Sequence, residues 1–143
     1  MLVIAGYTER PESRAALERA VEEARLRSAE LHVVHSVQEC PTESPSQIQQ
    51  WGQKVDRARA DGAAFEARMR DLGITARYEV IAASPASAAE HLLGLADRRR
   101  AELIVIGLRR RSPVGKLVLG SVSRDVLLGA ACPVLAIKAR SNG

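Results

Sequence analysis

The sequence contains few aromatic residues, and this shortage limits how its core is built. Phenylalanine, tryptophan and tyrosine make up 3% of the 143 residues, whereas apolar residues make up 46%. A hydrophobic core therefore has to consist of alanine, valine, leucine and isoleucine. The length is close to the commonest size of one domain. We therefore expect a single domain that spans residues 1–143.

Cysteines are also scarce, and long apolar runs are absent. Cys40 and Cys132 lie far apart and form neither a CxxC nor a Cys/His ligand pattern, which argues against a disulfide framework and a structural zinc site. No apolar run approaches the roughly 18 residues that a membrane-spanning helix needs. The apolar residues 1–6 are too short for a secretion signal and lack a basic start. We therefore expect a soluble, cytoplasmic protein.

The net charge of +4 comes from 21 basic and 17 acidic residues, and lysine occurs only at positions 54, 116 and 138. This balance is compatible with anionic partners, but it is also typical of an ordinary solvated surface. From charge alone, the ordinary surface is the favoured interpretation. We expect no specific binding of nucleic acids.

Short apolar runs alternate with segments of helical periodicity along the whole chain. The runs cover residues 2–7, 31–37, 103–107 and 134–137, and residues 74–82 alternate between apolar and other side chains, as expected for a half-exposed strand at a sheet edge. Between them, apolar residues recur at spacings of three and four, which is typical of helices. Five strands separated by helices predict an α/β fold, a single doubly wound parallel sheet with helices on both faces. Ligands bind beyond the carboxyl ends of such strands. The segments to search there follow Tyr7, Val37, Ala82 and Gly107.

The longest predicted helix occupies residues 44–73, from a serine-proline start to a glycine stop. Its apolar positions form one uninterrupted stripe, so we expect Trp51, Phe65 and Met69 to lie in the core. A second serine-proline start, at Ser84, opens the next helix, and residues 97–102 should form a charged turn after it.

Residues 106–121 carry the most informative chemistry. Gly107 ends an apolar strand, a basic loop with three arginines at 109–111 follows, and Gly120 and Ser121 open a helix. Glycine allows a ligand or another backbone to come close, and the unpaired amides at a helix start favour an anion. The alternative is that Gly107 only ends the strand, Ser121 only caps the helix and the arginines are solvated. The residues alone weigh these two interpretations about evenly.

Two common phosphate-binding motifs are excluded. A Walker A loop would need glycine at Arg110 and serine or threonine at Leu117. A Rossmann fingerprint would need GxGxxG after the first strand, and the chain has Tyr-Thr-Glu-Arg at residues 7–10 instead.

Several segments together resemble the universal stress protein family. Residues 103–107 (LIVIG), 120–127 (GSVSRDVL) and 132–137 (CPVLAI) resemble the carboxyl-terminal signature of that family, and residues 11–17 (PESRAAL) resemble its amino-terminal part. The resemblance covers essentially the whole chain. It implies an adenine nucleotide α-hydrolase-like fold with strand order 3-2-1-4-5, and a homodimer that forms through the last strand, residues 134–137.

ATP-binding members of this family carry the pattern G-x2-G-x9-G-[ST]. The resemblance places its first glycine on Gly107, its second on Arg110 and its last pair on Gly120 and Ser121. Those members usually have an aspartate after the first strand, where this chain has Thr8. A family position that lines the adenine pocket matches Ser36, which would equally serve as a small buried hydroxyl. The implied ATP-binding set, with magnesium accompanying the nucleotide, is Thr8, Ser36, Gly107, Arg110, Gly120, Ser121, Val122 and Ser123.

Arg110 and Thr8 depart from the family pattern and leave two hypotheses of similar weight. A side chain at position 110 would obstruct the approach that glycine permits, although an arginine could instead pair with phosphate. The first hypothesis is a nucleotide-binding, dimeric stress-response regulator. The second is an interaction module of the same fold that has lost nucleotide binding. An enzyme ranks last, because the sequence offers no nucleophile motif such as GxSxG.

The three histidines have no acidic or cysteine partner at ligand spacing. His32 and His35 lie on the second predicted strand, and His91 lies on the third predicted helix. We expect packing or exposure rather than metal binding for all three.

Overall fold

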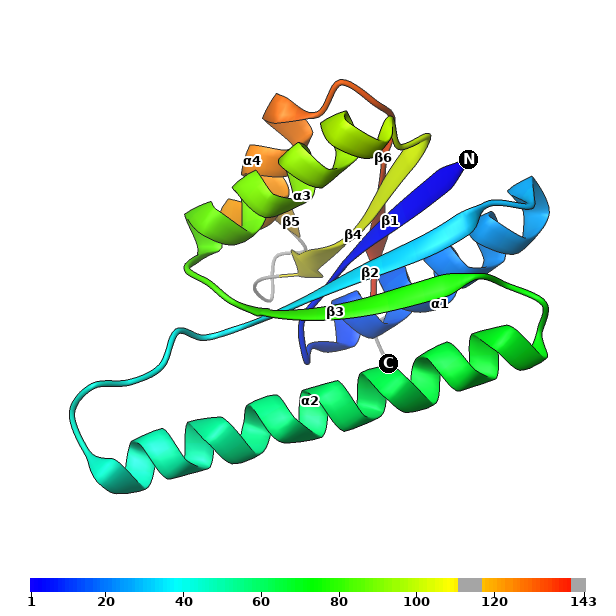
Figure 1. Ribbon diagram of the computed structural model, residues 1–143. Helices are drawn as coiled ribbons and strands as arrows, with labels where there is room; N and C mark the ends of the chain where they lie inside the picture. The colour runs from blue at the N-terminus through cyan, green and yellow to red at the C-terminus, as the bar shows by residue number, and fades with distance from the viewer. Residues whose placement is uncertain (111–116, 140–143) are drawn as a thin grey trace.

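Five parallel strands form the central sheet of the computed structural model, which describes residues 1–110 and 117–139 (Figure 1). They are β1 (Leu2–Tyr7), β2 (Glu30–Val37), β3 (Ala76–Ala82), β4 (Leu103–Arg110) and β6 (Val134–Lys138). Their order across the sheet is β3-β2-β1-β4-β6, which confirms the predicted order 3-2-1-4-5. A two-residue strand, β5 (Leu117–Val118), pairs antiparallel with the end of β4.

Two helices cover each face of the sheet. Helices α1 (Pro11–Arg27) and α2 (Pro45–Asp71) lie on one face, and α3 (Pro85–Arg99) and α4 (Ser121–Gly129) lie on the other. The predicted doubly wound architecture is therefore confirmed. The core on both sides is mainly aliphatic, as the composition requires, and Phe65 is the one phenylalanine within it. Among the residues described, no helix is both long enough and apolar enough to cross a membrane.

Serine caps and prolines start two of the helices, as predicted. The Ser44 hydroxyl accepts a hydrogen bond from the Gln47 amide at 3.2 Å, and Ser84 does the same for the Ser87 amide at 3.2 Å. Each satisfies one amide that has no partner within its own helix. Gly73 follows α2 with a φ of 76°, the left-handed conformation that glycine adopts without a Cβ penalty.

Three local predictions are wrong. Strand β4 continues past Gly107 to Arg110, so Gly107 lies within the strand and Arg109 belongs to it rather than to a basic loop. Residues 97–99 form the last turn of α3 rather than a charged turn, and the helix ends at Arg100 with a φ of 51°. Cations at that end oppose the negative end of the helix dipole, so the charged run stabilises the helix. Trp51 is partly exposed rather than in the core, because the first part of α2 projects past the edge of the sheet (Figure 1). Its indole Nε1 donates to the Gln38 carbonyl at 2.7 Å.

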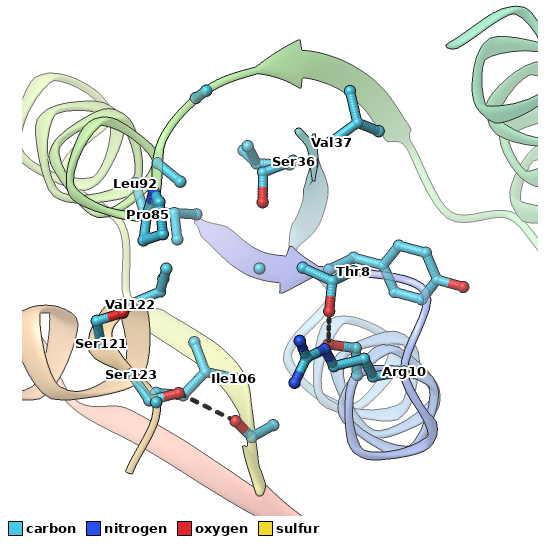
Figure 2. Close-up of a pocket in the computed structure, with 18 of the residues that line it drawn as sticks. Thr8, Arg10, Ser36, Val37, Pro85, Leu92, Ile106, Ser121, Val122 and Ser123 are labelled. Carbon is cyan, nitrogen blue, oxygen red and sulfur yellow. Dashed lines mark hydrogen bonds between the residues drawn. The ribbon is translucent and has the colours of Figure 1, made fainter. Parts of the chain in front are cut away.

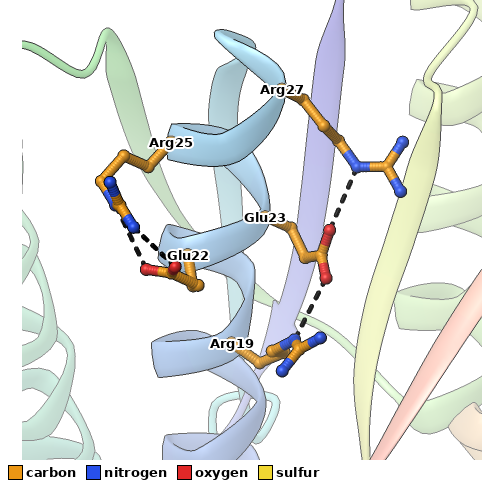
Figure 3. A network of polar contacts seen from close by, with 5 residues as sticks. All are labelled: Arg19, Glu22, Glu23, Arg25 and Arg27. Atoms are coloured by element: carbon orange, nitrogen blue, oxygen red, sulfur yellow. Dashed lines mark hydrogen bonds and ion pairs between the residues drawn. The ribbon is translucent and has the colours of Figure 1, made fainter.

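Ion pairs run along α1 (Figure 3), and one more joins the helix to the residue just before β4. Glu23 accepts from Arg19 Nε and Arg27 Nε, each at 3.1 Å and each one turn away. Such pairs contribute a few tenths of a kcal/mol each. Arg27 Nη1 also lies 3.3 Å from a carboxylate oxygen of Glu102, just before β4. This pair adds a small contribution to the packing of α1 against β4, whose far end borders the candidate site.

Candidate functional site

A cavity of about 580 Å³ opens at the carboxyl edge of the sheet (Figure 2). The segments after β1, β2 and β3 all reach it, as do the last part of β4, from Ile106 to Arg109, and the start of α4. Its floor is apolar and includes Val34, Leu92 and Ile106. This size lies within the range of pockets that hold small ligands. The four segments selected from the sequence therefore converge on one hollow.

Seven of the eight residues selected from the sequence line this cavity. They are Thr8, Ser36, Gly107, Gly120, Ser121, Val122 and Ser123. Arg110 is the eighth; its backbone ends β4, and its side chain lies outside the described part of the chain. The basic residues Arg111 and Lys116 also lie outside it.

The start of α4 presents backbone amides to the cavity. Gly120 is the residue before the helix, and the first helical hydrogen bond runs from the Arg124 amide to its carbonyl at 2.9 Å. The amides of residues 121–123 precede that bond and have no partner within the helix. A serine or aspartate at position 120 would satisfy one of them with its own side chain. Glycine leaves them available to an anionic ligand.

The two site glycines serve different purposes. A Cβ built on Gly107 would lie 2.5 Å from the Glu12 carbonyl oxygen and 2.9 Å from the Ser13 nitrogen, both in the first turn of α1. Close packing of α1 against β4 therefore explains Gly107, and it is the approach of another backbone that the sequence allowed there. A Cβ on Gly120 would have no atom within 4 Å, so no described protein neighbour requires glycine at that position.

Two of the site hydroxyls already have protein partners. Ser123 Oγ donates to the Gly107 carbonyl at 3.1 Å, and Thr8 Oγ1 lies 3.0 Å from Ser13 Oγ. The first ties the start of α4 to β4, and the second ties the start of α1 to the residue after β1. Ser36 differs, because its hydroxyl points into the cavity (Figure 2) and has no hydrogen-bond partner among the residues that the structure describes.

Charged side chains divide the cavity into two unlike ends. Arg10 and Arg109 line the side formed by α1 and β4, and Arg109 Nε lies 3.9 Å from a carboxylate oxygen of Glu12. Glu39 lines the side that follows β2. Three further lining residues, Arg10, Glu12 and Glu39, were not predicted from the sequence. Their positions directly after strands one and two were the available signal.

A profile of the universal stress protein family matches residues 2–138. The chain belongs to the universal stress protein family. A universal stress protein from Mycolicibacterium smegmatis is 36% identical over 137 residues, which cover 96% of this chain and 97% of the relative. The family and the fold expected from the sequence are thus confirmed.

Solved structures of relatives extend this comparison. A universal stress protein from Archaeoglobus fulgidus shares 32% identity with a TM-score of 0.66, over 96% of this chain and 97% of that one. A second structure of a universal stress protein from Archaeoglobus fulgidus was solved in complex with dAMP. It shares 28% identity with a TM-score of 0.61, over 96% of each chain.

A polar cluster beneath α3 joins two of the histidines to an acidic residue that lies far from His32 in the sequence. Glu79 on β3 lies 2.9 Å from His32 Nε2 on β2 and 3.0 Å from His91 Nε2 on α3. Burial raises the pKa of Glu79, but the two imidazoles outweigh burial and bring its pKa below the usual 4.5. No metal-binding group of three such side chains occurs within the described ranges.

The third histidine packs on the opposite face of the sheet. His35 is 3% exposed, and its Nδ1 lies 2.9 Å from the Tyr78 hydroxyl. Burial lowers the pKa of His35 below its usual 6.5, although Glu9 and Asp61 act in the opposite direction. Burial also raises the pKa of Tyr78. Packing, as expected, accounts for His35.

Proposed function

We propose that this universal stress protein binds an adenine nucleotide, such as ATP with magnesium, in the cavity at the carboxyl edge of its sheet. In this proposal it acts as a nucleotide-dependent, dimeric stress-response regulator in the cytosol. The observation that carries the proposal is Gly120, because its missing side chain faces open space beside three amides without helical partners. The relative solved with dAMP supports the same class of ligand.

The polar groups suggest how a nucleotide would lie in the cavity. Its phosphates would meet the amides of residues 121–123, where the positive end of the helix dipole favours negative charge. Its base would extend over the apolar floor toward the free hydroxyl of Ser36 and the segment after β2. The unlike charges at the two ends, arginine near the phosphates and Glu39 near the base, support this direction.

Calorimetric titration with ATP, with and without magnesium, tests the proposal. We expect saturable binding by the wild-type protein and at least tenfold weaker binding by Gly120→Val, whose side chain would occupy the space at the phosphate end. Gly52→Val is the matched control, because a Cβ on Gly52 in α2 also meets no atom within 4 Å and Gly52 does not line the cavity. The absence of heat and of any thermal shift at millimolar ATP would remove the proposal.

A second candidate function is an interaction module that no longer binds nucleotide. The hydrogen bonds Thr8–Ser13 and Ser123–Gly107 favour it, since they occupy hydroxyls that a nucleotide would otherwise use. Nucleotide released by denaturing protein freshly purified from cells would refute this candidate. Protein that is purified without bound nucleotide and shows no ATP binding in the calorimetric titration would support this candidate.

We also propose that a homodimer forms through β6 and that bound nucleotide is not turned over. Strand β6 pairs with β4 on one side, and no other described strand pairs with it, so its second edge can accept a strand of another copy. Light scattering should give twice the chain mass of 15.5 kDa, and a monomer at all concentrations would contradict the dimer. Release of phosphate from ATP above the buffer rate would contradict the lack of turnover.

A further inference from the structure

Hydrogen bonds hold the backbone of Arg10, but its side chain does not cap the helix that follows. Its amide donates to the Thr8 carbonyl at 2.8 Å, and its own carbonyl accepts from the amides of Ser13 and Arg14 at 3.0 and 3.1 Å. These bonds set Arg10 as the residue that precedes α1, but its side chain makes no capping hydrogen bond. The guanidinium is therefore presented from a rigid turn without a structural task of its own.

The guanidinium of Arg10 is directed from the β1 side toward the interior of the cavity (Figure 2). Within residues 1–110 and 117–139, no carboxylate lies at ion-pair distance from it. Arg109 differs, because Glu12 lies 3.9 Å from its Nε and partly neutralises it. An exposed guanidinium without an internal partner is suited to a phosphate, which it can bind through two parallel hydrogen bonds.

The first turns of α1 and α4 both meet β4 at Gly107. Ser123 of α4 donates to the Gly107 carbonyl, and the Glu12 backbone of α1 packs against the Gly107 Cα. Because α1 and α4 cover opposite faces of the sheet and the starts of both line the cavity, a phosphate chain that crosses the cavity would lead from the α4 amides toward Arg10. A single phosphate at the α4 amides would not need to make that crossing.

We infer that Arg10 is the residue by which this cavity distinguishes nucleoside polyphosphates from monophosphates. The inference rests on the proposed nucleotide-binding function and adds its phosphate specificity. In it, the amides at the start of α4 hold the first phosphate, and Arg10 binds the terminal phosphates of a di- or triphosphate. Arg109 adds weaker positive charge between them, because Glu12 offsets part of it.

Calorimetric titration of the wild type and of Arg10→Gln with AMP, ADP and ATP tests this inference. The wild type should bind ATP and ADP about tenfold or more tightly than AMP, as expected for a charge-assisted hydrogen bond in a partly enclosed site. Arg10→Gln should lose about tenfold in affinity for ATP and change less than twofold for AMP. Arg14→Gln is the matched control, since Arg14 is an exposed α1 arginine that does not line the cavity.

The possible outcomes separate the inference from the proposed function. Equal affinity of the wild type for AMP and ATP, or an unchanged ATP-to-AMP ratio in Arg10→Gln, overturns the role of Arg10 and leaves nucleotide binding intact. An equal loss of ATP affinity in Arg14→Gln would mean that the loss in Arg10→Gln reflects general surface charge, and this result also overturns the role of Arg10. Failure of every nucleotide to bind the wild type overturns both proposals. Circular dichroism and thermal unfolding check that both variants are folded.

Discussion

Replacing Gly107 by alanine should destabilise the fold, whereas the same replacement at Gly120 should mainly affect ligand binding. The added methyl at position 107 would lie 2.5 Å from the Glu12 carbonyl oxygen. Ordinary van der Waals contact begins at 3.4 Å, so the first turn of α1 would have to retreat by about 0.9 Å. The neighbouring buried positions of α1, Ser13 and Ala16, are 7% and 0% exposed, so this movement would disturb a packed interface.

The magnitude follows from the cost of overpacking. Inserting a methyl group into a well-packed core typically costs about 1–3 kcal/mol, and here the obstructing atoms belong to a backbone rather than to a flexible side chain. We therefore expect Gly107→Ala to lose about 2–3 kcal/mol in the free energy of unfolding. For a chain of this size, that loss corresponds to a melting temperature lower by roughly 5–10 °C.

Gly120→Ala provides the contrast, because its backbone angles of −64° and 162° are open to any residue. Alanine is a poorer residue than glycine before a helix, but it also restricts the unfolded chain, which offsets about 0.4–1 kcal/mol. The free energy of unfolding should therefore stay within about 0.5 kcal/mol of the wild type. ATP affinity should nevertheless fall, because the methyl would project into the space assigned to the phosphates.

Urea unfolding monitored by circular dichroism measures both stabilities, and a shared m-value shows that the midpoints report stability alone. Our interpretation of Gly107 fails if Gly107→Ala unfolds within about 0.5 kcal/mol of the wild type. The interpretation of Gly120 fails if Gly120→Ala loses as much stability as Gly107→Ala, since that would reveal a packing role that the structure does not contain.

Three further predictions concern groups away from the cavity. Gly62→Ala should lose about 1–3 kcal/mol in the free energy of unfolding, because its methyl would overlap the Tyr78 ring. Gly52→Ala, in the same helix, should gain about 0.5–1 kcal/mol, because its methyl would meet no atom within 4 Å. Equal effects of the two variants in urea unfolding would contradict this packing. Because the pKa of His35 is below its usual 6.5 in the folded state, the unfolded chain binds more protons, and stability should decline as pH falls below about 6.5. His35→Gln should flatten that decline between pH 7.5 and 5, and an unchanged slope would assign it to another group. Because the pKa of Glu79 is below 4.5 in the folded state, its carboxylate stabilises the fold above about pH 4.5, and this contribution is lost as pH falls through the folded pKa. Glu79→Gln should therefore be about 1 kcal/mol less stable than the wild type at pH 7, and a difference in melting temperature that persists undiminished at pH 3 would refute this role.

The local sequence pattern was sufficient to predict the five parallel strands, the four helices and the edge of the sheet where the cavity lies. Helical periodicity and apolar runs depend on which side chains share a face, and this follows from the backbone repeat alone. The serine-proline starts at Ser44 and Ser84 were predictable for a similar reason, because a cap acts on amides two or three residues away. The location of the cavity follows from the general rule for parallel sheets.

Other features depended on neighbours that are distant in the sequence. Periodicity placed Trp51 on the apolar stripe of its helix, but only the length of the strands that α2 packs along decides where that stripe stops being covered (Figure 1). Glu79 is 47 residues from His32, so no local spacing could pair them.

The site glycines separate the two sources of information most clearly. The sequence by itself placed Gly107 on a strand and Gly120 at a helix start, because apolar runs and helical periodicity mark both elements, although the strand continues beyond Gly107 to Arg110. Only the tertiary structure decided that α1 packs against the first and that open space lies beside the second. The physical reason is that a missing side chain has no effect of its own; its role depends on which atoms, if any, occupy the space it leaves.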